Sequence, residues 1–352
     1  MAFKPLFCKL HLGKMQTGFL LNKSHNMDEL RKIAVLTSGG DSPGMNAAIR
    51  AVVKTGLYHG LEVYGVYRGF NGMVNNVIKP LGREDVKNIL PLGGTILKSA
   101  RCEEFKTPEG RKKSYDNLKK NNIDALVAIG GDGTFTGAKI FMNEFDFPVI
   151  GLPGTIDNDL FGTDYTIGYD TAVNTVVNAV DKLRDTAYSH DMVFIVEVMG
   201  RDAGFIALRS GMASGAGKVL IPETKTHIDD LLERLQRRIA DEETSAIIIV
   251  SEGDDFGGAM EVKKIVNERF PDLGTRVTIL GHIQRGGSPS AFDRILASGL
   301  GYQAVRGLME GRSGVMVGSV NRKVEFIPFD RSIKHHNKIN VELKEITEIL
   351  GL

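Results

Sequence analysis

The stretch Leu126-Val127-Ala128-Ile129-Gly130-Gly131-Asp132-Gly133-Thr134 joins a short apolar run to a glycine-rich turn. An apolar run of this length, bounded by turn residues, is typical of a buried strand. The glycines let a phosphate group approach the backbone N–H groups at the start of a following helix, where the helix dipole favours an anion. The stretch therefore predicts a strand, turn and helix that can bind phosphate, although taken alone it is also an ordinary strand-to-helix turn.

A second stretch of the same kind follows further along the chain. Pro148-Val149-Ile150-Gly151-Leu152 predicts a buried strand, and Pro153-Gly154-Thr155-Ile156-Asp157-Asn158-Asp159 comes directly after it. Its two carboxylates suit phosphoryl transfer, because one can accept the proton of an attacking hydroxyl while the other helps to hold a magnesium ion. Each stretch alone can be an ordinary loop, but the two together, each after its own strand, predict a shared site.

Strands and helices are expected to alternate along most of the chain. The helix predicted at residues 169–188 carries Ala172, Val176, Val180 and Leu183 at helical spacing. Further strands are expected at residues 33–37, 61–66, 163–167, 193–198, 218–221, 245–250 and 276–280. Further helices are expected at residues 47–59, 110–121, 135–143, 228–240, 261–269 and 289–309, the last capped by Ser288. This alternation predicts a doubly wound α/β fold with mostly parallel sheets and ligands at the carboxyl ends of the strands.

The composition is that of a soluble globular protein. Of the 352 residues, 42% are hydrophobic and 25% are charged, and the length allows two domains. Lys and Arg number 44 against 43 Asp and Glu, so no overall field favours nucleic acid or a membrane surface. Two cysteines, Cys8 and Cys102, cannot form a disulfide framework. These features lead us to expect a cytoplasmic protein.

Charged side chains also follow the predicted strands in the second half of the chain. These residues are Arg201, Glu252, Arg276, His282 and Arg285. The arginine fork suits phosphate oxygens, while glutamate and histidine suit sugar hydroxyls. Each residue alone is more often a surface residue, but their recurrence at strand ends predicts a pocket for a phosphorylated sugar. A metal-binding role for His282 is not expected, since no second histidine or cysteine lies nearby.

Three motifs of this chain resemble those of the ATP-dependent 6-phosphofructokinase family: residues 130–134, 153–159 and 281–287. The resemblance extends from about Lys32 to about Val315. It implies an N-terminal extension of residues 1–30 and two interleaved, doubly wound domains. Residues 31–168 and 281–334 would bind the nucleotide, and residues 169–280 and 335–352 would bind the sugar phosphate. The implied glycolytic reaction transfers a phosphoryl group from Mg-ATP to the 1-hydroxyl of fructose 6-phosphate, giving fructose 1,6-bisphosphate and ADP.

The resemblance also implies a role for each matching residue. Asp157 would be the general base, Arg201 would stabilise the transferring phosphoryl group, and Thr155 would contact that group. Asp132 and Asp159 would be the carboxylates on the magnesium side. The other nucleotide contacts would be Gly40, Arg101, Cys102, Gly131, Gly133, Thr134 and Gly137. The remaining sugar-phosphate contacts would be Met199, Gly200, Glu252, His282 and Arg285, with Arg276 supplied by a neighbouring subunit of a homotetramer.

Three alternatives remain open at this point. A pyrophosphate-dependent phosphofructokinase usually carries aspartate and lysine where this chain has Gly133 and Gly154, and a carboxylate at 133 would repel the α-phosphate of ATP. A non-catalytic paralogue that binds sugar phosphate would not need the intact Asp157, Asp132 and Arg201. Another kinase with a Gly-Gly-Asp-Gly loop, such as an NAD or lipid kinase, would not explain residues 281–287.

The chain departs from the bacterial members of the family at positions linked to control. Met192 stands where many of them carry an arginine for the sugar 6-phosphate. At the effector pocket Arg50 and Arg184 are kept, but Gly217 replaces a glutamate and residues 240–245 replace a basic run with an acidic one. For an allosteric enzyme of this family we therefore expect weak control by ADP or phosphoenolpyruvate and a raised KM for fructose 6-phosphate. The alternative is that Met192 only packs at a subunit contact.

Overall fold

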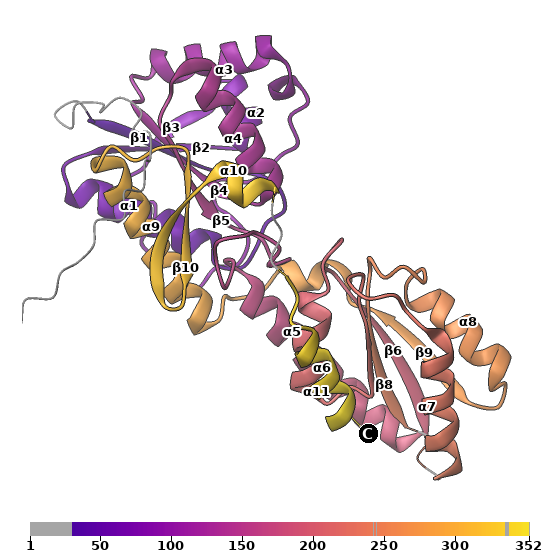
Figure 1. Ribbon diagram of the computed structural model, residues 1–352. Coiled ribbons are helices and arrows are strands. Elements are labelled where there is room, and N and C mark those ends of the chain that lie inside the picture. The colour runs from indigo at the N-terminus through magenta and orange to yellow at the C-terminus, as the bar shows by residue number, and fades with distance from the viewer. Residues whose placement is uncertain (1–29, 242, 244, 335–337, 352) are drawn as a thin grey trace, which may run out of the picture.

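The computed structural model describes residues 30–241, 243, 245–334 and 338–351. The predicted N-terminal extension lies outside the described residues except for Leu30, which packs against the core of the first lobe. Two β-sheets organise the molecule, one in each of two lobes (Figure 1). In the described part of the chain, no helix has the length and apolar character that a membrane crossing requires.

The larger sheet has seven strands in the order β11-β10-β5-β4-β1-β2-β3. Its inner strands are parallel, whereas β3 and β11 pair antiparallel at the two edges. The bounds are β1 (Lys32–Thr37), β2 (Glu62–Val66), β3 (Ile78–Pro80), β4 (Ala125–Gly130), β5 (Val149–Pro153), β10 (Val315–Val320) and β11 (Lys323–Pro328). All six residues of β4 are buried, because helices cover both faces of the sheet.

Two helical layers enclose this sheet. One layer consists of α1 (Met45–Tyr58) and α9 (Ala291–Met309), which pack on each other and on one face. The other face is covered by α2 (Gly69–Val74), α3 (Pro108–Lys120), α4 (Asp132–Phe145) and α10 (Phe329–Lys334). A short 3-10 helix, η2 (Glu104–Lys106), packs against α3.

The smaller sheet has four parallel strands in the order β7-β8-β6-β9. These are β6 (Met192–Val198), β7 (Lys218–Leu220), β8 (Ala246–Ser251) and β9 (Gly274–Ile279). One face carries α5 (Tyr169–Ser189), α6 (Phe205–Ser214) and α11 (Val341–Leu350), and the other carries α7 (Ile228–Ala240) and α8 (Ala259–Arg269). The predicted α/β fold with mostly parallel sheets is confirmed. The exact domain boundaries stay a prediction, which the allocation of strands to the two sheets supports.

The strand predicted at residues 163–167 is wrong. The structure has an irregular loop there, and only Ile167 makes an isolated bridge, to Gly154. Nearby side chains form hydrogen bonds with backbone groups that would pair with a neighbouring strand in a sheet. The Thr163 hydroxyl donates to the Tyr165 carbonyl at 2.8 Å, and Thr166 N–H donates to Asn158 Oδ1 at 2.7 Å. Such local bonds compete with sheet formation, so β-branched residues alone did not identify a strand.

The predicted cap of the long helix α9 is also wrong by two residues. Ser290, not Ser288, accepts a hydrogen bond from the N–H of Asp293, at 3.2 Å. Ser288 instead donates to the Pro91 carbonyl at 2.8 Å. The buried Asp293 carboxylate accepts bonds from Gly168 N–H at 2.9 Å, and from the N–H and hydroxyl of Thr171 at 2.8 and 2.5 Å. Asp293 thereby joins the start of α9 to the start of α5, at the junction between the lobes.

We expect Asp293 to make stability depend on pH. Burial raises the pKa of its carboxyl from 3.8 to about 6, although the bonds from Thr171 and Gly168 oppose this shift. Between these pH values the native state binds more protons than the unfolded state, so this group's contribution to stability is complete at low pH and falls as the pH rises towards 6. Lowering the pH from 7 to 5 should therefore raise the free energy of unfolding of the unmodified protein relative to that of Asp293→Asn, by at most about 1.4 kcal/mol per pH unit.

Urea unfolding at pH 5, 6 and 7 measures this difference. If the free energies of unfolding of the two proteins change in parallel over that range, Asp293 does not titrate as described.

Candidate active site

The candidate active site begins where three neighbouring strands end. In the larger sheet β4 lies between β1 and β5, so their carboxyl ends share one edge. Ser38 N–H donates to the Ile129 carbonyl at 3.0 Å, and Gly154 N–H donates to the Gly130 carbonyl at 3.0 Å. These bonds extend the strand pairing into the loops and fix where each loop starts. The two stretches predicted to share a site therefore lie side by side.

A cavity of about 160 Å³ lies at this edge of the sheet. Ten of its lining residues are among those predicted from the sequence: Gly40, Gly131, Asp132, Gly133, Thr134, Thr155, Asp157, Asp159, Arg201 and Arg285. Ser38, Gly39 and Gly154 also line it and were not in that set. Gly39 and Gly154 each adjoin a predicted residue and Ser38 lies two residues before Gly40, so taking each strand-end loop as a unit would have found them.

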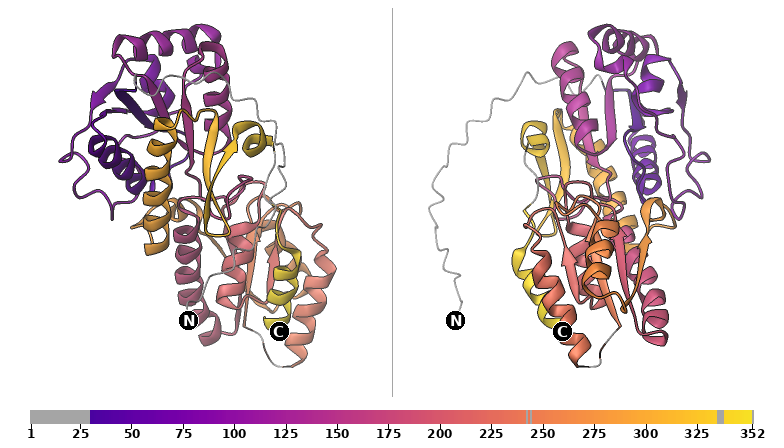
Figure 2. Two further views of the ribbon diagram at one scale, coloured as in Figure 1. Left: turned by 60° about the vertical axis from the view of Figure 1, so that its left-hand side comes forward. Right: turned by 90° about the vertical axis from the view of Figure 1, so that its right-hand side faces the viewer.

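Two of these residues reach the cavity from the smaller sheet. Arg201 follows β6, and Arg285 ends the 3-10 helix η3 (Gly281–Arg285) that follows β9. The two lobes lie against each other in both views of Figure 2, with these strand-end loops at their junction. The cavity therefore combines glycine-rich turns from one sheet with cationic side chains from the other.

Asp157 is the most enclosed carboxylate at the cavity, with 4% of the residue exposed. Its Oδ2 lies 3.7 Å from Arg201 Nε, and its Oδ1 has no hydrogen-bond partner among the described residues. Burial raises the pKa of the Asp157 carboxyl and the charge of Asp159 raises it further, whereas Arg201 and then Arg285 lower it. A carboxylate with a raised pKa and an oxygen free to accept a proton is suited to general-base catalysis.

The position of Arg201 is set by its backbone. Its φ is 53°, in the left-handed region that non-glycine residues rarely adopt. Glu252 Oε1 accepts hydrogen bonds from the N–H groups of Arg201 and Gly200, at 2.9 and 3.3 Å. Glu252 thus holds the turn that directs Arg201 towards Asp157. The sugar contact predicted for Glu252 stays a prediction.

Two side chains tie the glycine-rich turns together. The buried Thr134 hydroxyl donates to the Ser38 carbonyl at 3.1 Å, which links the turn after β4 to the turn after β1. Arg285 Nη1 donates to the Asp41 carbonyl at 3.2 Å. A Cβ on Gly40 would lie 2.2 Å from that same nitrogen, so only glycine at position 40 leaves room for Arg285 where it lies.

Asp132 and Asp159 fit a role beside a magnesium ion. Both line the cavity, and Asp132 is the first residue of α4. The described residues contain no cluster of three or more metal-binding side chains. Magnesium is usually held by one or two carboxylates together with phosphate oxygens and water, so two carboxylates are a sufficient protein contribution.

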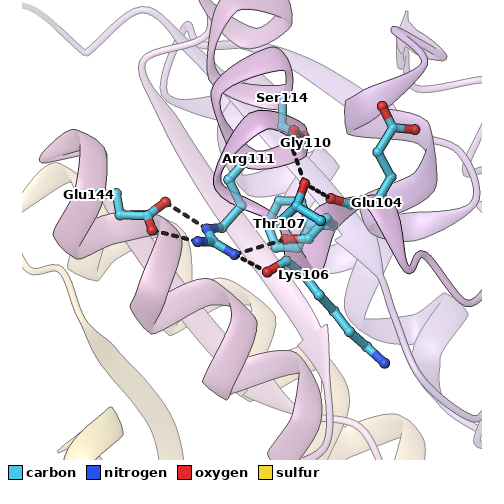
Figure 3. A network of polar contacts seen from close by, with 8 residues as sticks. Glu104, Lys106, Thr107, Gly110, Arg111, Ser114 and Glu144 are labelled. Atoms are coloured by element: carbon cyan, nitrogen blue, oxygen red, sulfur yellow. Dashed lines mark hydrogen bonds and ion pairs between the residues drawn. The ribbon is translucent and has the colours of Figure 1, made fainter.

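A buried arginine, Arg111, holds the short helix η2 and the residues beside it in place (Figure 3). Arg111 binds both carboxylate oxygens of Glu144 at 2.6 Å, and donates to the carbonyls of Phe105 and Lys106 at 3.2 and 2.6 Å. This network joins α3, α4 and η2 (Figure 3). It fixes the segment that follows Arg101 and Cys102, which do not line the cavity, so their nucleotide contacts stay predictions.

Comparison with known protein families assigns residues 32–308 to the family described as Phosphofructokinase. The chain belongs to the phosphofructokinase family. It is 53% identical to "ATP-dependent 6-phosphofructokinase 2" of Bacteroides thetaiotaomicron, over 93% of this chain and 100% of that protein. It is 52% identical to "ATP-dependent 6-phosphofructokinase 1" of Thermus thermophilus, over 92% and 100% of the two chains.

Solved structures agree with this membership. A phosphofructokinase from Saccharomyces cerevisiae matches with a TM-score of 0.83 and 40% identity, over 86% of this chain and 45% of that longer chain. A pyrophosphate-dependent phosphofructokinase from Marinobacter aquaeolei matches with a TM-score of 0.80 at 21% identity. The second likeness shows the shared fold alone.

The two glycines expected to distinguish members of the phosphofructokinase family have different surroundings. A Cβ on Gly133 would meet no atom within 4 Å, so a larger side chain fits there, at the rim of the cavity. A Cβ on Gly154 would lie 2.9 Å from Ile129 Cγ2 and 3.0 Å from Met45 Cε. Position 154 is therefore restricted by core packing, whereas position 133 has room for a side chain beside the cavity.

Several predicted residues do not line the cavity. Arg276 and His282 are exposed, and Arg276 Nη1 donates to the neighbouring Thr275 carbonyl at 3.2 Å. Met199 N–H donates to the side chain of Gln284 at 3.2 Å, and this fully buried glutamine also donates to the Gly281 carbonyl at 3.0 Å. Gln284, which the sequence analysis did not single out, thus fixes the loop that carries Arg285. Gly137 packs beside the stacked rings of Phe70 and Phe105.

Proposed function

We propose that this chain is an ATP-dependent 6-phosphofructokinase. It phosphorylates the 1-hydroxyl of fructose 6-phosphate and releases fructose 1,6-bisphosphate and ADP, a step of glycolysis. The observation that carries this function is the buried Asp157 beside Arg201, in a cavity bounded by glycine-rich loops from three adjacent strands. The relatives that are about half identical over nearly the whole chain carry the name of this activity.

In the proposed mechanism Asp157 accepts the proton of the 1-hydroxyl while the oxygen attacks the γ-phosphorus of ATP. A bond forms between that oxygen and phosphorus, and the bond from phosphorus to the bridging oxygen of ADP breaks. Arg201 approaches Asp157 to 3.7 Å, so its guanidinium is close enough to stabilise charge on the transferring group. The backbone N–H groups of Gly133 and its neighbours at the start of α4 suit the nucleotide phosphates.

Magnesium would neutralise charge on the β- and γ-phosphates, and Asp132 and Asp159 would hold it. Both carboxylates line the same cavity as Asp157. Asp159 also raises the pKa of Asp157, so a cation bound beside Asp159 would favour the ionised base.

A coupled assay with fructose 6-phosphate as acceptor tests the function. ATP should support turnover, and pyrophosphate at the same concentration should not. Preference for pyrophosphate, or no turnover with either donor, would refute the proposal.

Two further expectations stay predictions. One is the cytoplasmic location. The other is the effect of Met192, which is half-buried and packs against the core of the smaller lobe.

Arg201 should influence the pH profile through Asp157. Because its positive charge lowers the pKa of Asp157, Arg201→Gln should raise that pKa. The base acts only when ionised, so the acidic limb of kcat/KM should move to higher pH, in addition to a loss of rate. Arg201→Lys keeps the charge and should leave the limb nearly in place. A limb that stays fixed in both variants contradicts the electrostatic coupling.

We further propose a homotetramer in which Arg276 serves the site of a neighbouring subunit. Arg276 is exposed on β9 and does not line the cavity of its own chain. Nearby, Ile279 and Ile283 are each 57% exposed, as apolar residues at a subunit contact would be in one isolated chain. Sedimentation should give four chains per particle. Arg276→Ala should raise the KM for fructose 6-phosphate without changing the KM for ATP, and an active monomer would exclude the shared site.

A further inference from the structure

A second hollow lies beside the end of β2, α2 and β3. Its volume is about 490 Å³, and it shares no lining residue with the catalytic cavity. The residues that matter are Tyr67 and Arg68 after β2, Asn71 on α2, Val77 and Lys79 at β3, and Lys98. Pockets of this size commonly bind molecules as large as a nucleotide.

The charge of this hollow is one-sided. Arg68, Lys79 and Lys98 all line it, and no lining residue is acidic. None of the three forms an ion pair with a carboxylate in the described chain, unlike surface cations such as Lys87, Lys106 and Arg237. The Lys79 ammonium lies 5.6 Å from the centre of the Tyr67 ring, which leaves an aromatic surface beside the cations. Three uncompensated cations around one hollow favour an anionic ligand.

The backbone brings two of these cations together at an energetic cost. Arg68 and Lys98 have φ values of 66° and 60°, in the left-handed region. Arg68 N–H donates to the Leu97 carbonyl at 2.7 Å, which joins the two turns directly. Glycine would adopt both conformations without strain, so arginine and lysine there suggest that the side chains themselves are used.

Hydrogen bonds connect the segment that carries Lys98 to the turn that lines the catalytic cavity. The Thr37 hydroxyl donates to the Lys98 carbonyl at 3.0 Å, and the Ser99 hydroxyl donates to the Gly39 carbonyl at 2.6 Å. Thr37 ends β1 and directly precedes the cavity residues Ser38, Gly39 and Gly40. A ligand that holds Lys98 would therefore also hold the turn on which the proposed catalytic nucleotide rests.

We propose that this hollow binds a phosphate-bearing anion of nucleotide size, separately from the catalytic nucleotide. The cations would bind the phosphate oxygens, and the Tyr67 ring with the Asn71 amide would contact a planar or polar remainder. The same phosphate chemistry occurs in nucleoside phosphates and in inorganic polyphosphate, so the two sources must be distinguished by experiment.

The test measures acetylation of individual lysines in the unmodified full chain by mass spectrometry. ADP or inorganic tripolyphosphate should slow the acetylation of Lys79 and Lys98 at least threefold with a saturable dose dependence, and adenosine should not. Lys120 and Lys264, exposed elsewhere on the surface, should react unchanged. Protection by ADP alone identifies a nucleotide site, and equal protection by tripolyphosphate identifies a polyphosphate site. Absence of protection by both refutes the proposal.

Two variants separate this hollow from the catalytic cavity. Gly133→Asp should weaken catalytic nucleotide binding and leave the protection of Lys79 and Lys98 intact; if protection disappears with it, the effect comes from the catalytic site and the proposal fails. Arg68→Asn should reduce the protection at least threefold, because asparagine tolerates the left-handed backbone but removes one charge. Lys120→Gln removes one surface charge elsewhere and should not change it.

Discussion

Replacing Asp157 with asparagine should lower kcat by about 10² to 10⁴-fold, the usual contribution of a general base. Asparagine has nearly the same shape but cannot accept the proton of the 1-hydroxyl. Because Asp157 is buried and its Oδ1 makes no hydrogen bond in the described chain, few structural contacts should be lost with the charge. The KM values should change little, since the phosphate and sugar contacts remain.

Steady-state kinetics and thermal unfolding should be measured together for this variant. Asp159→Asn is a useful comparison, because it removes a neighbouring carboxylate from the same cavity but should act through magnesium. Raising the magnesium concentration should partly restore the kcat of Asp159→Asn, whereas it should not restore the kcat of Asp157→Asn. A kcat within threefold of the unmodified enzyme would show that Asp157 is not the base.

Gly133→Asp should lower kcat/KM for ATP by roughly tenfold to a hundredfold while leaving the fold intact. The position has room for a side chain, but a carboxylate there would face the nucleotide phosphates. Repulsion between like charges about 6 to 12 Å apart, at an effective dielectric constant of about 20, is roughly 1.4 to 2.8 kcal/mol, which corresponds to that range.

Gly133→Asn provides the matched control, because it has the same size without the charge. It should keep most of the activity with ATP and the same melting temperature as Gly133→Asp. If both variants lose activity equally, the size of the new side chain rather than its charge weakens the use of ATP. Gly154→Ala should behave differently and lower the melting temperature, since its Cβ would press on Ile129 and Met45.

The sequence predicted the framework because its inner strands are buried on both faces. Continuous apolar runs such as Leu126–Ile129 leave a clear signal when helices cover both sides of a sheet. The edge strands β3 and β11 gave no such signal, because their residues are mostly half-buried or exposed. The false strand at residues 163–167 had the right residue types, but its polar backbone groups are bonded locally through Thr163 and Asn158.

The site was predictable to the extent that each residue follows a strand. Strand ends brought Asp132, Asp157 and Arg201 together, although nothing in their spacing gave the 3.7 Å approach of Arg201 to Asp157. Contacts between distant loops could not be read in this way. The hydrogen bond from the N–H of Met199 to the side chain of Gln284 depends on how β6 and β9 pair, and the sequence does not state that register.

The path of the chain between the two sheets has a consequence for how this protein can be divided. The chain leaves the larger sheet after β5, returns to it after β9, and ends in α11, which packs on α6 and β7 of the smaller one. A break in the loop after β8 would leave strands of both sheets in each fragment, so the fragments should remain associated. Neither lobe corresponds to one continuous gene segment, and exchange of a lobe between relatives would require several matched junctions instead of one.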